Sequence, residues 1–209
     1  MKAVLLALLL IGTIYSRSFD NSTRMYGIGY MQRFEFGSTS RFNTMKTDNS
    51  LPSLKKFLRF HGAMFYAHLT DDIVIGLKTF GALSESSNNN GFSSLGGAVG
   101  GFFVQYHWKI KEYGTVYVGT TLSCGRFSYT SQTNKGSGII GFNDNFFFEP
   151  TVGGNIHIPQ AFTLNIEYSR FIISGFGNAV WNNGDKTTKI VPDGNMIGAG
   201  ILWGIPAYL

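Results

Sequence analysis

The sequence predicts an all-β protein that forms an eight-stranded antiparallel up-and-down transmembrane β-barrel. Three observations lead to this prediction. Beyond Phe19 the apolar residues recur at every second position, which is the period of a strand and not of a helix. Most of these alternating stretches run to ten residues or more, whereas strands of soluble proteins average about 5–6 residues. Tight turns alternate with longer links that are rich in Ser, Asn and Gly.

The composition excludes several other classes of protein. Of the 209 residues, 14% are charged and 15% are aromatic, whereas an ordinary soluble domain carries roughly 25% charged residues. A disordered chain would be poor in aromatics and rich in charge. The single cysteine, Cys124, excludes a disulfide scaffold and a cysteine-based zinc site. The formal net charge of +5 is weak and dispersed, so we expect no nucleic-acid partner.

The first 18 residues are expected to be a signal peptide. Lys2 supplies a positive start, and the apolar run Ala3–Ile14 is too short to span a bilayer of ~30 Å as a helix. Ser16 and Ser18 have the spacing of a cleavage site, and cleavage after either residue fits the pattern. Residues 19–209 are then expected to form a single barrel domain.

Eight strands account for most of that domain. The expected strands are Met25–Gly37, Lys56–His68, Ile73–Leu83, Phe92–Lys109, Thr115–Thr130, Gly141–Ile158, Phe162–Gly175 and Asn195–Ile205. At ~3.3 Å per residue and a tilt near 40°, eleven residues climb about 28 Å. That height is close to the apolar band of an outer-membrane barrel, so the strand length favours a membrane-spanning barrel.

The connections between these strands alternate in length. Tight turns are expected at Asp71-Asp72, Lys111–Gly114 and Pro159–Ala161. The longer links are Ser38–Lys55, Ser84–Gly91, Ser131–Gly138 and Phe176–Gly194. Strict alternation places all long links at one end of an up-and-down barrel, where they are expected to form exposed interaction sites.

The alternation also predicts which face meets lipid. The polar set of each strand is mainly Gly, Asn, Thr and Ser with isolated charges, which is a poor surface against water. We therefore expect the apolar set to face lipid. Its representatives are Phe146, Phe148, Val152, Ile156, Leu164, Ile166 and Trp203. A secreted lipocalin-like barrel, with its apolar set turned inward around a ligand, is the soluble alternative.

The charges of the polar set are expected to form an interior network. Its members are Arg33, Glu35, Arg59, Lys78, Arg126, Glu149 and Glu167. Three carboxylates and four cations nearly balance, and the interior of an eight-stranded barrel is only just filled by side chains. The network is therefore expected to plug the lumen. A narrow porin-like solute channel lined by the same groups is the alternative.

Two local patterns fix the orientation of these charges. A two-residue turn at Asp71-Asp72 pairs Thr70 with Ile73 and places Arg59 and Lys78 on one face. Val116, Val118 and Leu122 lie on the same face of their strand as Arg126. If Arg126 points inward, they also point inward, unless a β-bulge exchanges the two faces halfway along the strand.

No catalytic residue, metal site or cofactor is expected. His61, His107 and His157 fall on the polar face as hydrogen-bonding groups, and no histidine pair has metal-ligand spacing. The run Gly96–Gly101 lacks the Lys-Ser/Thr of a phosphate-binding loop. A lipid-modifying enzyme in the same barrel is an alternative, which would need a histidine within hydrogen-bond reach of its nucleophile.

Taken together, the sequence resembles the small eight-stranded outer-membrane barrels of the OmpA/OmpX-type and related porin-like families. The stretch Phe148–Gly154 leading into Pro159 and Glu167–Arg170 carries this resemblance, together with Gly198–Trp203 as a closing strand. The end of the chain departs from the family pattern, because such barrels usually end on an aromatic residue whereas Tyr208 is penultimate here.

The resemblance implies a location and a set of partners. The location is the outer membrane of a Gram-negative-type bacterium, reached through export with a cleaved signal peptide. The partners are outer-membrane lipid, the barrel-assembly machinery and an extracellular ligand at the long loops. The implied role is structural or surface-interacting and not enzymatic.

Overall fold

The computed structural model describes residues 26–45, 48–110, 114–158, 162–173, 179–183 and 189–204. The expected signal peptide, residues 111–113 and 159–161 of two expected tight turns, and the chain after Gly204 lie outside the described residues. The elements are β1 (Tyr26–Phe36), α2 (Ser38–Asn43), β2 (Phe57–His68), β3 (Ile73–Asn88), β4 (Gly91–Ile110), β5 (Gly114–Thr133), β6 (Gly138–Ile158), β7 (Phe162–Arg170), β8 (Ile172–Ile173), β9 (Val180–Trp181) and β10 (Asn195–Trp203).

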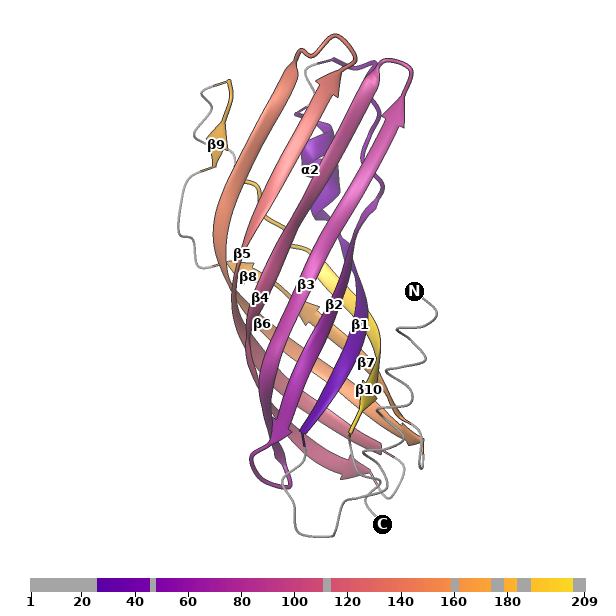
Figure 1. The fold of residues 1–209 in the computed structure, drawn as a ribbon, viewed down its shortest axis with the longest axis vertical. Helices are drawn as coiled ribbons and strands as arrows, with labels where there is room; N and C mark the ends of the chain where they lie inside the picture. Colours follow the sequence, from indigo (N-terminus) through magenta and orange to yellow (C-terminus); the bar gives the residue numbers. More distant parts are fainter. Residues whose placement is uncertain are drawn as a thin grey trace.

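The strands close into a barrel (Figure 1). Each long strand pairs antiparallel with its neighbour in the chain, β10 pairs with β7, and β1 pairs with β10 to complete the ring. The short β8 continues the register of β7 along β6, because Phe148 faces Ile172 just as Thr151 faces Ser169. The predicted eight-stranded antiparallel barrel is confirmed.

The barrel wall is much taller on one side. Strands β3 to β6 have 16 to 21 residues, whereas β1, β7 and β10 have 9 to 11. In Figure 1 the four long strands rise well past the others at the end away from the tight turns. This end of the barrel is called the long-loop end below, and the opposite end the tight-turn end.

Two of the expected long links are shorter than predicted, because six of the eight residues of Ser84–Gly91 and four of the eight residues of Ser131–Gly138 belong to strands. Only Asn89 and Asn90 separate β3 from β4, and only residues 134–137 separate β5 from β6. The alternation of faces continues through the Ser-rich segments, since Ser93 and Ser131 are fully buried and their hydroxyls lie 3.2 Å apart. Ser84, Ser93 and Ser131 therefore fill inward positions of strands.

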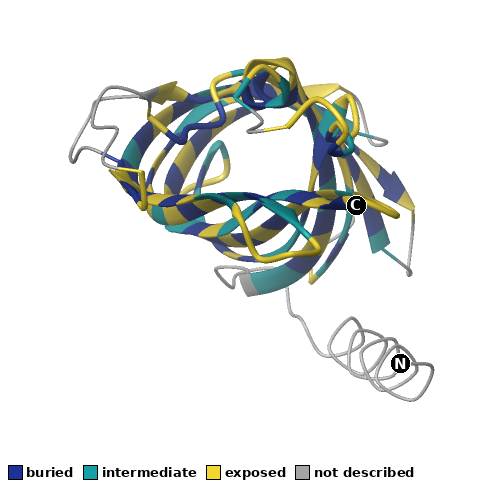
Figure 2. Ribbon diagram, turned by 90° about the horizontal axis from the view of Figure 1, so that it is seen from above, coloured by how far each residue is buried: buried dark blue, intermediate teal, exposed yellow. Residues whose placement is uncertain are grey.

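The link between β1 and β2 folds back into the mouth of the barrel. Phe42 of α2 and Leu54 are buried, and the Tyr129 hydroxyl donates a 3.0 Å hydrogen bond to the Phe42 carbonyl. Ile190 and Val191, which precede β10, are buried beside them. Seen from above, the short helix α2 lies at the rim of the barrel (Figure 2). Two links expected to be exposed interaction loops therefore bury part of their residues in the core.

The register between β2 and β3 differs from the expected one by one residue. His68 faces Val74, and the Leu69 amide donates to the Ile73 carbonyl, so the turn is longer than two residues. A shift of one residue exchanges the two faces of a strand relative to its partner. Lys78 consequently shares the inner face with Phe60 and not with Arg59.

Candidate functional site

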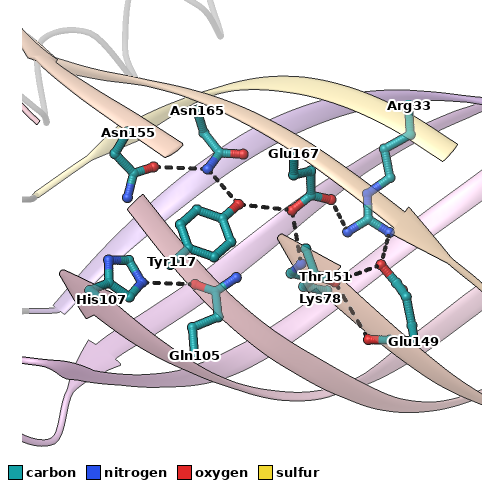
Figure 3. A network of polar contacts seen from close by, with 10 residues as sticks. All are labelled: Arg33, Lys78, Gln105, His107, Tyr117, Glu149, Thr151, Asn155, Asn165 and Glu167. Atoms are coloured by element: carbon teal, nitrogen blue, oxygen red, sulfur yellow. Dashed lines mark hydrogen bonds and ion pairs between the residues drawn. The ribbon is translucent and has the colours of Figure 1, made fainter. Parts of the chain in front are cut away.

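A cluster of four buried charges lies inside the barrel (Figure 3). Arg33 Nη1 lies 2.9 Å from Glu149 Oε1, and Arg33 forms a second ion pair with Glu167. Lys78 Nζ lies 3.2 Å from the other oxygen of Glu167. All four side chains are at most 3% exposed. Burial of an unpaired charge costs free energy, so each of the four side chains requires its ion-pair partners in order to be buried.

The charges come from strands on different sides of the barrel. Arg33 lies on β1, Lys78 on β3, and the two glutamates on β6 and β7, so the ion pairs cross the lumen. Aromatic rings line the cluster as well, with the Arg33 guanidinium 4.1 Å from the centre of the Phe80 ring. The cluster thus ties opposite walls together and fills the middle of the lumen.

Uncharged polar side chains continue the cluster toward the tight-turn end. The Tyr117 hydroxyl donates to Glu167 Oε2 at 3.2 Å, and Asn165 Nδ2 donates to that hydroxyl at 2.8 Å. The ring of His107 stacks on Tyr117 with centroids 4.9 Å apart, and it contacts Gln105 at 3.1 Å (Figure 3). One small cavity lies beside Lys78 and Glu149 and another beside Gln105 and His107, and each holds about 10 Å³, roughly one water molecule.

Four phenylalanines close the lumen on the other side of the ion cluster. Phe60, Phe127, Phe147 and Phe171 are at most 2% exposed and contact one another in a closed ring, with centroids 4.6 to 6.2 Å apart. Sequence reasoning missed this layer and named none of its four phenylalanines as interior residues, Phe147 of β6 included. Its position among the inward residues of β6 was the signal that could have revealed it.

The other predicted interior charges lie elsewhere. Glu35 is inside the barrel but apart from the cluster, where it accepts hydrogen bonds from the amide and hydroxyl of Ser38 at 3.1 and 2.6 Å. The prediction for Arg59 is wrong, since the one-residue register shift described above turns it outward.

The prediction for Arg126 is also wrong. Its guanidinium pairs with Asp144 on the outside at 2.6 and 2.8 Å, and the two side chains are 63% and 62% exposed. Strand β5 pairs with β6 without a bulge, so Thr121 and Ser123 point inward and Leu122 points outward. The apolar residues Val116, Val118 and Leu122 of β5 face outward, and Arg126 lies on the same face because it is an even number of residues away from them.

The predicted lipid-facing residues lie on the outer surface of the barrel. Phe148, Val152, Ile156, Leu164 and Ile166 are 36% to 58% exposed, and Phe146 and Trp203 are half-buried. Exposed rings and aliphatic side chains continue around the wall, with Tyr30, Phe65, Leu77, Phe102, Val104, Tyr106, Trp108, Val116, Val118, Tyr168 and Ile197 among them. The outer surface of the barrel is therefore predominantly apolar.

The described ranges contain neither a candidate metal centre nor a helix that could span a membrane. Among these residues no group of three or more His, Cys, Asp or Glu side chains is arranged to hold a metal ion. None of the helices in this part of the chain has the length and hydropathy needed to cross a membrane.

Comparison with known proteins finds similarity at the level of structure. The chain is similar to the N-terminal β-barrel domain of Pseudomonas aeruginosa OprF, with 12% identity, 87% and 97% of the two chains covered and a TM-score of 0.48. It is similar to the attachment invasion locus protein Ail of Yersinia pestis, with 13% identity, 86% and 97% coverage and a TM-score of 0.43. It is also similar to Neisserial surface protein A, with 10% identity, 88% and 100% coverage and a TM-score of 0.48. No protein-family model and no curated protein matches the sequence.

Proposed function

We propose that the protein is an integral β-barrel of a bacterial outer membrane. The observation that carries this proposal is the distribution of charge on the outer face. Along the described strands, every outward-facing Lys, Arg, Asp or Glu lies toward the long-loop end. These residues are Arg59, Glu85, Arg126, Asp144 and Arg170. Below them the outer face of the described strands carries no charged side chain. The exposed Lys109, next to the last residue of β4 at the tight-turn end, lies in the register of the inward-facing His107.

The height of this uncharged band suits a bilayer. On β5 the outward positions between Gly114 and Arg126 span twelve residues, which climb about 30 Å at ~3.3 Å per residue and a tilt near 40°. The apolar band of an outer-membrane barrel is about 25 Å tall. A soluble barrel of this size would expose a band of apolar side chains to water, whereas a membrane barrel places it in acyl chains.

We further propose that the lumen is closed and that the role is structural or surface-interacting, not catalytic. The paired charges, the phenylalanine ring and the folded β1–β2 link lie one after another along the lumen. Interaction with an extracellular ligand would use the exposed tips of β3 to β6. Export through a cleaved signal peptide and insertion by the barrel-assembly machinery belong to this proposal.

Membrane extraction tests the proposal. We expect the protein to remain in the membrane fraction after a carbonate wash and to require detergent for release. After extraction it should migrate as a compact species on a gel and shift on boiling, as a closed membrane barrel does. Release by carbonate alone would contradict the proposal and favour a secreted lipocalin-like carrier.

Planar-bilayer recordings test whether the lumen is closed. We expect the wild-type protein to show no large, stable conductance, because the ion cluster and the phenylalanine ring fill the barrel. Glu149→Gln should also conduct little, since it leaves the phenylalanine ring in place. A large, stable wild-type conductance that Glu149→Gln abolishes would instead favour the narrow channel.

A further inference from the structure

A cluster of polar side chains interrupts the apolar outer face on β1 and β2. The Tyr30 hydroxyl lies 2.7 Å from His61 Nδ1, and the Tyr30 side chain is 46% exposed. Beside them, Arg59 Nε and Nη2 donate to the amide oxygen of Gln32 at 2.9 and 3.1 Å once the Gln32 carboxamide is oriented with its oxygen toward the guanidinium. These four residues are called the outer polar cluster.

The outer polar cluster includes a cation without an anion. No ion pair joins Arg59 to any carboxylate of the described residues, whereas Arg126 is paired with Asp144. The Gln32 amide is a neutral partner and leaves the Arg59 charge uncompensated. A guanidinium that meets the edge of a bilayer is stabilised by an anion, and its planar donor groups suit phosphate best.

The depth of Arg59 places it where lipid phosphates lie. Arg59 is nine residues from His68, the last residue of β2 at the tight-turn end. Nine residues climb about 23 Å at ~3.3 Å per residue and a tilt near 40°, which is close to the upper edge of an apolar band about 25 Å tall. The side chain therefore lies near the boundary between the acyl chains and the headgroups of the leaflet at the long-loop end.

The surface next to the cluster has room for a lipid. Across the sheet His61 faces Gly81, Gly81 faces Ala98, and Ala98 faces Arg126. A side chain added at Gly81 would find no atom within 4 Å, so the outer face beside His61 is open. In Figure 1 the strands β2, β3 and β4 that carry this row lie side by side. Small residues on two adjacent strands thus separate the outer polar cluster from Arg126.

We propose that the outer polar cluster binds the phosphate of a membrane-lipid headgroup. Arg59 supplies the charge and a hydrogen bond to the phosphate, with Tyr30 and His61 as neighbouring hydrogen-bonding groups. An acyl chain of the same lipid lies over Gly81 and Ala98. This inference rests on the proposed function, because it requires the outer face of β1 to β4 to lie in a bilayer.

The test measures binding of a phosphorylated lipid to the folded protein in detergent micelles. Lipid A is titrated by native mass spectrometry against the wild type, Arg59→Gln and the matched control Arg126→Gln, and dephosphorylated lipid A is titrated in parallel. We expect Arg59→Gln to weaken lipid A binding about tenfold, as for the loss of one charge-assisted contact. Arg126→Gln should bind like the wild type, because its guanidinium is already paired. Removal of the phosphates from lipid A should weaken wild-type binding by a similar factor.

Further outcomes distinguish this inference from its alternatives. Gly81→Leu should weaken lipid A binding while Arg59 is retained, since it fills the open surface beside His61. Equal binding of lipid A by Arg59→Gln and the wild type would overturn the site. Displacement of lipid A by an equal concentration of inorganic phosphate would show a site for the free anion and overturn the assignment to a lipid. Failure of the wild type to insert into vesicles would contradict the proposed function, whereas insertion without phosphate dependence would contradict only this inference.

Discussion

Glu167→Ala is expected to lower the free energy of unfolding by about 3–5 kcal/mol, the cost of breaking a buried ion pair by removing one partner. Glu167 pairs with both Arg33 and Lys78 and accepts a hydrogen bond from Tyr117, and all of these groups are buried. Its loss leaves Lys78 without a carboxylate partner and Arg33 with Glu149 alone. Urea unfolding of the protein reconstituted in vesicles, followed by tryptophan fluorescence, measures the change.

Two control variants make this result specific. Glu85→Ala removes an outward, exposed carboxylate and should change the free energy of unfolding by less than about 0.5 kcal/mol. Glu167→Gln keeps the shape and an acceptor for Tyr117, so it should cost less than Glu167→Ala. If Glu167→Ala and Glu85→Ala had equally small effects, the ion cluster would not be the stabilising centre of the lumen.

Phe147→Ala is expected to lower the free energy of unfolding by about 3–5 kcal/mol as well. The Phe147 side chain is fully buried, and its ring centre lies 4.6 Å from that of Phe171 and 5.9 Å from that of Phe127. Its truncation opens a cavity in a layer whose other members are held by the barrel wall, so the surroundings can relax only partly. The same urea titration measures this loss.

The adjacent residue is the matched control for this prediction. Phe148 is 39% exposed on the outer face of β6, so in a bilayer its ring contacts lipid that fills the space left by truncation. Phe148→Ala should therefore cost clearly less than Phe147→Ala. A larger loss for Phe148→Ala would mean that the outward face of β6 is the packed one, which would reverse the orientation of the strand.

The alternation of apolar and polar residues was enough to predict the barrel and many of the residues that face its lumen. Strand β6 alternates cleanly, so the inward side of Glu149 followed from its neighbours. The same reasoning applied to Glu167, because the apolar residues Leu164 and Ile166 fix the outward side of β7. Both side chains meet Arg33 only because the closed barrel brings β1, β6 and β7 around one lumen.

The failed predictions have specific physical causes. The orientation of Arg59 was inferred from the length of a turn, and one additional residue in that turn exchanges the faces of the strand. Arg126 is predicted to point inward together with the other charges assigned to the polar set. Its partner Asp144 comes from a neighbouring strand and is revealed only by the pairing of β5 with β6. The phenylalanine ring likewise depends on contacts between distant strands.

We propose that the apolar set of the barrel faces lipid and the polar set faces the lumen. Spin labels at Ile166 and at its neighbour Asn165, in a Cys124→Ser background, test it in reconstituted vesicles. We expect the label at Ile166 to be accessible to oxygen dissolved in the acyl chains and shielded from a water-soluble nickel chelate, and the label at Asn165 to be immobilised and shielded from both. A label at Ile166 packed inside the cylinder, with the label at Asn165 exposed to the nickel chelate, would contradict the account.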